Sequence, residues 1–184
     1  MLPVRYRVEG RPLISVTQVL TLAERIDRTW FTPESAERGR IVHALTEAFD
    51  RGDPLVIPPG LAGYVEAYAS FLAVVRPVYV ASEVAATSAL LGLGGRIDRV
   101  CADLFDRPGL LDFKTGDPAP WHGQQLALYN RLRPTGPRWA CYLRANGTYR
   151  LRRYTDPADD RRAMADLARV RGTVTVDGDF WIAR

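Results

Sequence analysis

Residues 94–116 read GGRIDRVCADLFDRPGLLDFKTG, and this stretch decides the fold. Its first half reads as a β-strand, Asp106–Gly109 (DRPG) is typical of a tight turn, and LLDFKTG at 110–116 reads as a second, short strand. Strands joined by a tight turn are expected to be antiparallel neighbours. Because residues two apart in a strand share a face, Asp112 and Lys114 point the same way. Asp98, on the first strand, is then expected to converge with Asp112 at one end of the sheet.

The second strand also holds the only lysine of the chain. Of 25 basic residues, 24 are arginine and one is Lys114. Arginine is planar, bulky and always charged, whereas lysine is a compact point charge whose pKa shifts readily when it is crowded. A lysine beside two carboxylates can orient a water molecule and stabilise negative charge that develops on a phosphate. A lysine left here by chance is the competing explanation.

Two converging carboxylates indicate a metal site. They repel each other, and an apolar setting raises their pKa values. A divalent cation removes this penalty, and hard oxygen ligands favour Mg²⁺ or Mn²⁺. Such an ion polarises a phosphoryl oxygen and lowers the pKa of a bound water molecule. The stretch therefore favours metal-assisted hydrolysis.

The flanking segments predict an α/β fold. Helices are expected over residues 15–27, 32–52 and 60–75, with Ser15 or Thr17 capping the first, Thr32 or Ser35 capping the second, and Gly52 ending it. Strands follow over 78–105 with a turn at 91–95, then a helix over 118–132, a hairpin over 138–154 and a helix over 157–171. This order predicts a central mixed β-sheet flanked by helices. We expect one domain over 1–184, with a mainly helical part at 1–75, a sheet core with one helix at 76–156, and a C-terminal helix and tail at 157–184.

Composition restricts the class of protein. The 184 residues suit one domain, and 47% apolar and 25% charged residues are ordinary for a soluble protein. The net charge of +4 favours polyanionic partners only mildly. Cys101 and Cys141 match no zinc or iron–sulfur spacing and are expected to be buried thiols. The N-terminus has no signal-peptide pattern, and the apolar stretch at 71–81 is broken by Arg76 and Pro77. We therefore expect an intracellular, cytoplasmic protein without a membrane partner.

Four motifs resemble a known family. GRIDRV, LLDFKTG and QLALY, preceded by RGRIVHALTEAFDRG, are similar to the PD-(D/E)XK nuclease superfamily in its RecB-like branch, over about residues 38–129. That branch includes the nuclease domains of recombination helicase–nucleases, Cas4 proteins and phage exonucleases. The resemblance implies a restriction-endonuclease-like core with an N-terminal helical segment. It also implies a Mg²⁺- or Mn²⁺-dependent nuclease that acts on DNA, as an exonuclease at DNA ends in recombination, repair or phage DNA processing.

The same resemblance implies the roles of individual residues. The metal ligands would be His43, Asp98, Asp112 and the carbonyl of Phe113. Lys114 would be the catalytic lysine, and Glu83 matches, more loosely, an acidic residue of the family's core. Gln125 and Tyr129, four apart on one helix face, would position DNA or steady the lysine. Simpler explanations remain for three of them: a polar residue at a helix boundary for His43, an exposed strand residue for Glu83, and core packing for Tyr129.

The resemblance also limits the cofactors and partners. Relatives with an iron–sulfur cluster hold it with four cysteines, so two cysteines predict no cluster here. The chain has no helicase motif, so a helicase or recombinase partner would be a separate protein. The stretch at 92–95 (GLGG) lacks the pattern of a phosphate-binding loop. Aromatic residues (Trp30, Phe31, Trp121) either stack on bases or pack in the core. Arginines of the second hairpin (Arg150, Arg152, Arg153) either follow phosphates or lie on a solvated face.

Two other functions compete with a nuclease. One is a catalytically inactive DNA-binding or assembly subunit that keeps the fold. The other is an unrelated α/β enzyme that uses Lys114 as a Schiff-base amine. His122 is expected in a loop or a first helical turn and is assigned no role.

Overall fold

The computed structural model describes residues 1–27 and 32–184, so Trp30 and Phe31 lie outside the described residues. In chain order the elements are β1 (Leu2–Pro3), β2 (Tyr6–Val8), β3 (Arg11–Ser15), α1 (Val16–Leu22), α2 (Pro33–Arg51), α3 (Ala62–Val75), β4 (Val78–Ser88), β5 (Leu93–Asp103), β6 (Gly109–Lys114), α4 (Trp121–Leu132), β7 (Arg138–Leu143), β8 (Tyr149–Tyr154), α5 (Pro157–Thr173), β9 (Val174–Asp177) and β10 (Phe180–Ala183).

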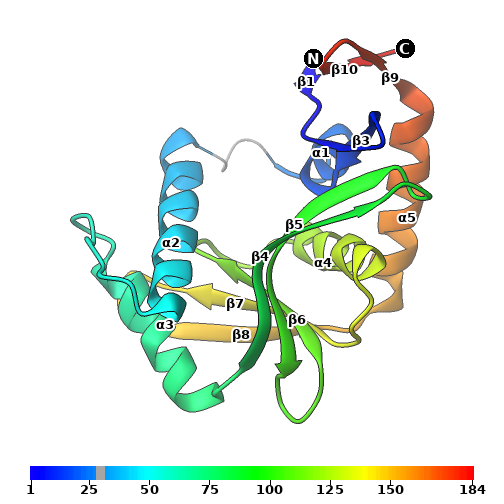
Figure 1. The fold of residues 1–184 in the computed structure, drawn as a ribbon. Helices are drawn as coiled ribbons and strands as arrows, with labels where there is room; N and C mark the ends of the chain where they lie inside the picture. The colour runs from blue at the N-terminus through cyan, green and yellow to red at the C-terminus, as the bar shows by residue number, and fades with distance from the viewer. Residues whose placement is uncertain (28–31) are drawn as a thin grey trace.

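The main sheet is mixed, as predicted. Its strand order is β2-β3-β5-β6-β7-β8, and β4 pairs with β5 beside this path. The pairs β3/β5 and β6/β7 are parallel, whereas β4/β5, β5/β6 and β7/β8 are antiparallel. Figure 1 shows the sheet between two groups of helices. The α/β fold with a central mixed sheet flanked by helices is confirmed.

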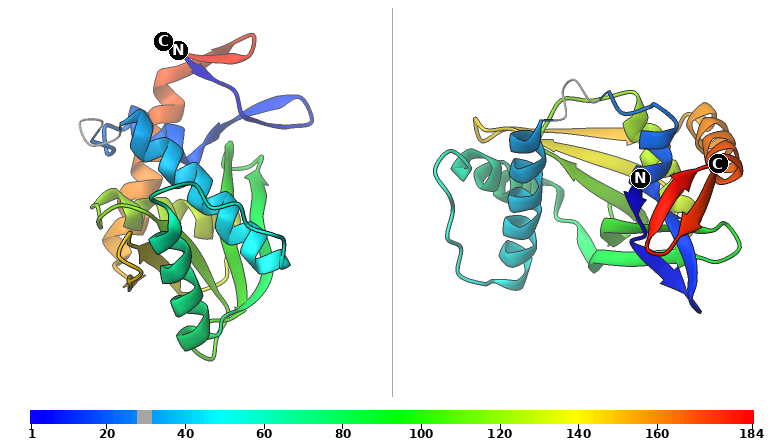
Figure 2. Two further views of the ribbon diagram at one scale, coloured as in Figure 1. Left: turned by 90° about the vertical axis from the view of Figure 1, so that its left-hand side faces the viewer. Right: turned by 90° about the horizontal axis from the view of Figure 1, so that it is seen from above.

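Two apolar clusters lie on opposite faces of this sheet. One joins the sheet to α1, α4 and α5, and the other joins it to α2 and α3 (Figures 1 and 2). Strand β6 contributes to both, because Leu110 belongs to the first cluster and Leu111 and Phe113 to the second. Its alternating side chains therefore place Asp112 on the face of α4 and bury Phe113 beneath α2 and α3.

Local signals determine where the N-terminal helices begin and end. Ser15 caps α1 and forms a reciprocal capping box with Gln18. Thr32 caps α2 by accepting a hydrogen bond from the backbone N–H of Ser35. Gly52 ends α2 in the left-handed conformation, with φ +71°. Thr32 and Gly52 therefore define the two ends of α2, the helix that carries His43.

The turn between β4 and β5 lies earlier than predicted. It spans residues 89–92 rather than 91–95, and Gly94 and Gly95 belong to β5. A Cβ on Gly94 would lie 2.6 Å from the Tyr6 ring, and one on Gly95 would lie 2.9 Å from the Tyr129 ring. Gly94 and Gly95 therefore allow close packing against these rings, and they do not form the turn.

Five short strands at the chain ends were not predicted. Strand β1 pairs with β10, and β10 with β9, which brings the two termini together (Figure 2). Strands β2 and β3 extend the main sheet. Two to five residues are too few to show a period. In addition, β1 pairs with β10 and β3 pairs with β5, which are distant in sequence. Within the described ranges, no helix has both the length and the apolarity needed to cross a membrane.

Candidate active site at the end of strand β6

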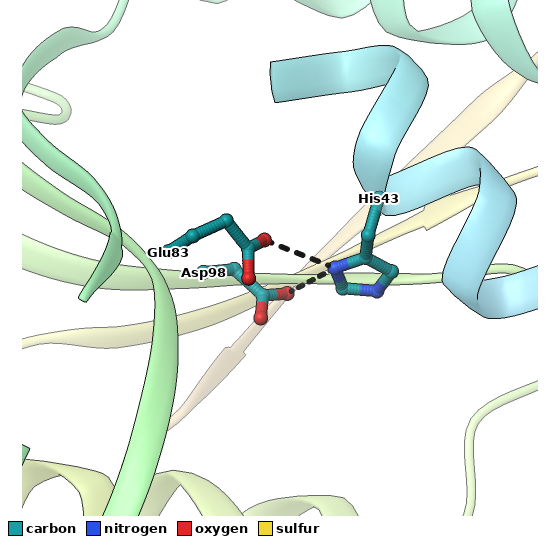
Figure 3. Close-up of side chains that lie close together, drawn as sticks. All are labelled: His43, Glu83 and Asp98. Atoms are coloured by element: carbon teal, nitrogen blue, oxygen red, sulfur yellow. Dashed lines mark hydrogen bonds and ion pairs between the residues drawn. The ribbon is translucent and has the colours of Figure 1, made fainter. Parts of the chain in front are cut away.

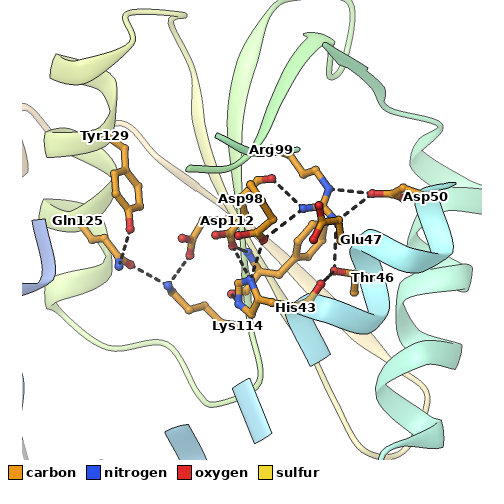
Figure 4. Close-up of polar contacts among 12 residues, drawn as sticks. His43, Thr46, Glu47, Asp50, Asp98, Arg99, Asp112, Lys114, Gln125 and Tyr129 are labelled. Atoms are coloured by element: carbon orange, nitrogen blue, oxygen red, sulfur yellow. Dashed lines mark hydrogen bonds and ion pairs between the residues drawn. The ribbon is translucent and has the colours of Figure 1, made fainter. Parts of the chain in front are cut away.

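Strand β6 ends in a chain of polar contacts that reaches α4 (Figure 4). Lys114 Nζ lies 2.5 Å from Asp112 Oδ2 and donates a hydrogen bond of 2.7 Å to Gln125 Oε1. Gln125 Nε2 in turn donates to the Tyr129 hydroxyl at 3.3 Å. Because Gln125 and Tyr129 are four residues apart on α4, one helix face holds the lysine in place. The helix itself is fixed by its buried leucines.

A second group of side chains lies beside this chain (Figure 3). His43 Nδ1 is 3.4 Å from Glu83 Oε1 and 3.4 Å from Asp98 Oδ2. One ligand atom from each of these three residues falls within 4.8 Å of the others. The three residues come from α2, β4 and β5, so tertiary packing alone brings them together.

The backbone of Phe113 connects the two groups. Its N–H donates to Asp98 Oδ2 at 2.7 Å, and its carbonyl accepts from His43 Nε2 at 3.1 Å. A histidine whose Nε2 carries the hydrogen leaves the Nδ1 lone pair free in the neutral form. The Nδ1 atom faces the carboxylates of Glu83 and Asp98 (Figure 3). The strand that carries Asp112 and Lys114 therefore also orients the histidine.

Glu83 enters the group through an unusual backbone conformation. Its φ is +51°, although it lies inside β4. Its neighbours Ser82 and Val84 pair with Arg99 and Ile97, which places Glu83 opposite Asp98. A non-glycine residue in this region carries about 1–2 kcal/mol of strain. The strained backbone directs the Glu83 carboxylate toward Asp98 and His43, and such strain is typical of functional sites.

The buried charges change each other's pKa. Burial opposes the charge on His43, but Asp98, Glu83 and Asp112 outweigh it and raise the pKa of His43 to about 9. Burial and the Asp98 charge raise the pKa of Asp112 to about 6, although Lys114 and His43 oppose this shift. The imidazolium thus adds to the positive charge of Lys114 and Arg99 that compensates the carboxylates when no metal ion is bound.

The donor set fits a hard divalent cation. Carboxylate oxygens and one imidazole nitrogen are ligands that Mg²⁺ and Mn²⁺ accept. In the described part of the chain, Asp112 Oδ2 is buried without a well-directed hydrogen bond, despite its ion pair with Lys114. A buried carboxylate oxygen without a hydrogen bond, beside the candidate ligands His43, Glu83 and Asp98, is a position that a metal ion satisfies.

Comparisons with known proteins identify the fold. No protein-family model matches the sequence, and no curated protein matches it. Among solved structures, an alkaline exonuclease from Laribacter hongkongensis matches with a TM-score of 0.52 and 13% identity, over 87% of this chain and 86% of that chain. The same exonuclease in complex with dAMP matches with a TM-score of 0.51 and 14% identity, over the same shares of both chains. The chain shares its fold with an alkaline exonuclease.

Arg99 is a residue near the candidate site that the sequence patterns did not single out. Its side chain is completely buried, and it donates to Asp50 Oδ2 at 2.9 Å, the Asp98 carbonyl at 2.7 Å and Thr46 Oγ1 at 3.2 Å. One signal was available, because strand alternation after Asp98 places Arg99 on the apolar face. A charge on that face needs a buried partner.

The fold brings the predicted residues together in two groups. His43, Glu83 and Asp98 form the first, and Asp112, Lys114, Gln125 and Tyr129 form the second. Phe113 lies between them with its carbonyl hydrogen-bonded to His43. The predicted roles of these residues as ligands and catalysts remain predictions.

Cys101, Cys141 and His122 lie in buried positions. Cys101 and Cys141 are buried free thiols, as expected. His122 lies in the first turn of α4 and is buried, with Nδ1 2.8 Å from the Tyr142 hydroxyl. Burial, together with Lys114 and Arg152, lowers the pKa of His122 to about 2, so this histidine is neutral.

Proposed function

We propose that the chain is a divalent-metal-dependent nuclease that hydrolyses phosphodiester bonds of DNA, as an exonuclease acting at DNA ends. One observation carries the proposal. The Asp112–Lys114 pair lies next to the His43–Glu83–Asp98 group, and the backbone of Phe113 links the two. The fold shared with an alkaline exonuclease supports this reaction class. The same proposal places the chain in the RecB-like branch. It also includes a role in recombination, repair or phage DNA processing, beside a helicase or recombinase.

His43, Glu83, Asp98 and Asp112 would hold the metal ion, Mg²⁺ or Mn²⁺. The bound ion would supply a polarised phosphoryl oxygen and a water molecule of lowered pKa. His43 presents Nδ1 to the site because its Nε2 is hydrogen-bonded to the Phe113 carbonyl. Asp98 is held in place by the Phe113 N–H.

Lys114 supplies the fixed positive charge of the reaction. Its ammonium lies between Asp112 and Gln125, so the group is held beside the Asp112 carboxylate. There it stabilises negative charge that develops on the scissile phosphate and orients the attacking water molecule. Tyr129 keeps the Gln125 side chain oriented, and Gln125 in turn limits the movement of the lysine.

Strand β8 offers a contact for the DNA backbone. In the strand register, Asp112 lies opposite Ala140 and Ala140 opposite Arg152, while Lys114, Tyr142 and Arg150 form the next row. Residues in one row share a face of the sheet. Arg150 and Arg152 are exposed on the face of the candidate site, whereas Arg153 reaches the other face, 5.7 Å from the Trp139 ring centroid. The exposure of Arg150 and Arg152 on this face supports the proposal that they bind phosphates of the DNA backbone.

Activity on DNA tests the proposal. The protein is incubated with linear and circular DNA in the presence of Mg²⁺, Mn²⁺ or EDTA. We expect metal-dependent degradation of linear DNA and at least a hundredfold loss in Lys114→Ala. Lys114→Arg is not expected to restore activity, because a guanidinium does not fit between Asp112 and Gln125 as an ammonium does.

Three results would contradict the proposal. Cleavage in EDTA would exclude a metal-dependent reaction, and full activity of Lys114→Ala would exclude a catalytic role of the lysine. Stoichiometric DNA binding without cleavage in any divalent metal would instead identify a DNA-binding or assembly subunit.

A further inference from the structure

A buried arginine lies directly behind the candidate metal ligands. The Arg99 side chain has no exposed surface, and its guanidinium lies between the rings of Tyr79 and Phe113, at 5.5 and 5.4 Å from their centroids. A guanidinium in such a place is stable only when carboxylates and carbonyls satisfy its donors. Its position is therefore set as firmly as that of a core residue.

This guanidinium joins the elements that carry the metal ligands. It contacts Thr46 and Asp50 on α2, the helix of His43. It contacts the carbonyl of Asp98 on β5, and it lies 3.6 Å from Glu83 Oε1 on β4. The same Glu83 oxygen lies 3.4 Å from His43 Nδ1. Glu83 Oε1 therefore lies between the His43 imidazole, a candidate metal ligand, and the permanent positive charge of Arg99.

The charges of this region balance for a single metal ion. Four carboxylates with side chains at most 14% exposed (Asp50, Glu83, Asp98, Asp112) surround two cationic side chains (Arg99, Lys114). With His43 neutral as a ligand, the region carries two net negative charges, which one divalent ion neutralises. A second divalent ion would leave two uncompensated positive charges in a buried region of low dielectric.

We propose that Arg99 is a built-in cation that takes the place of a second metal ion, so that the site binds one divalent ion per chain. The guanidinium neutralises Asp50 and lies against Glu83 Oε1, the same oxygen that faces His43. Arg99 touches no substrate in this arrangement and acts as a positioning residue. The inference rests on the proposed metal-dependent function.

Calorimetric titration of the full chain with Mn²⁺ tests the stoichiometry. We expect one equivalent of Mn²⁺ per chain. Two equivalents of similar affinity would overturn the inference and leave the proposed function standing. No binding at all would overturn the proposed function, and the inference with it.

A matched pair of variants tests the role of the Arg99 charge. Asp50→Asn keeps the shape of the partner but leaves the charge of Arg99 uncompensated next to Glu83. We expect it to bind Mn²⁺ about tenfold more weakly than the unsubstituted chain. Glu47→Gln removes the same charge from the same helix, but Glu47 is 35% exposed and paired with Arg51. We expect a change of less than about twofold there, because solvent screens the charge.

Circular dichroism and thermal unfolding confirm that both variants are folded before the titration. Equal affinities of Asp50→Asn and the unsubstituted chain would overturn the inference. Equal losses in the two variants would overturn it as well, because they would reduce the effect to net charge.

Discussion

The imidazole of His43 lies near three carboxylates, those of Asp98, Glu83 and Asp112, in the candidate metal site. Its pKa of about 9 means that it carries a proton at neutral pH when no metal is bound. A histidine ligates a metal only in its neutral form. Metal binding must therefore displace this proton, and metal affinity must fall as the pH falls below about 9.

Proton release during metal binding is the measurable consequence. At pH 7.5 we expect about one proton released for each Mn²⁺ bound, with the affinity rising about tenfold per pH unit up to pH 8.5. Calorimetry in two buffers of different ionisation enthalpy measures the number of protons. His43→Ala should bind Mn²⁺ more weakly and release no proton at this pH. An affinity of the unsubstituted chain that does not change between pH 6.5 and 8.5 would contradict the assignment.

The left-handed backbone of Glu83 makes a prediction about stability. Glu83→Ala and Glu83→Gly both remove the carboxylate, but only glycine adopts a φ of +51° without strain. We expect the free energy of unfolding of the Gly variant to exceed that of the Ala variant by about 1 kcal/mol. Urea unfolding followed by circular dichroism measures the difference. Equal stabilities would show that the strand relaxes out of this conformation.

At the scale of elements, the register of β6, β7 and β8 separates arginines that the sequence leaves equivalent. Arg152 and Arg153 are adjacent in the chain, yet they lie on opposite faces of the sheet. We expect Arg152→Ala to weaken DNA binding several-fold and to reduce the slope of log affinity against log salt by about 1. Arg153→Ala should leave both quantities unchanged.

Both arginine variants are made in the Lys114→Ala background, which prevents cleavage during the measurement. Fluorescence anisotropy with a labelled oligonucleotide at several salt concentrations gives the affinity and the slope. Equal effects of the two substitutions would argue against a backbone contact on the face of the candidate site.

Among the elements, some boundaries are determined by local sequence signals and others are not. The caps of α1 and α2 and the stop at Gly52 were predicted because a few neighbouring residues determine them. The five terminal strands were not predicted, because they are too short to show a period and because β1 and β3 pair with strands distant in sequence. The early turn before β5 depends on the packing of Gly94 and Gly95 against two tyrosine rings.

At the scale of the whole molecule, the candidate metal ligands join both faces of the sheet. His43 comes from α2, Glu83 from β4, Asp98 from β5 and Asp112 from β6. A ligand that binds the folded state alone stabilises it by mass action. A metal held by four elements has no comparable site in the unfolded chain, so its binding energy adds to the stability of the fold.

Thermal unfolding with and without Mn²⁺ tests this coupling. At a free concentration one hundred times the Kd we expect a gain of about 2.7 kcal/mol, and a rise in Tm of about 5–10 °C for a chain of this length. Asp98→Asn preserves shape and should show no rise, and EDTA should reverse the rise in the unsubstituted chain. A Tm that does not respond to Mn²⁺ would contradict a site shared by these elements.

By itself, the sequence determined the elements of the core, the mixed sheet, and the pairing of Asp112 with Lys114. These follow from strand alternation, turn residues and caps, which act over a few residues. Only the tertiary structure decided that Glu83 joins His43 and Asp98, that Phe113 links the two groups, and that Arg99 lies behind them. Those contacts depend on strand register and on the packing of α2, because they join residues that are 15 to 70 positions apart.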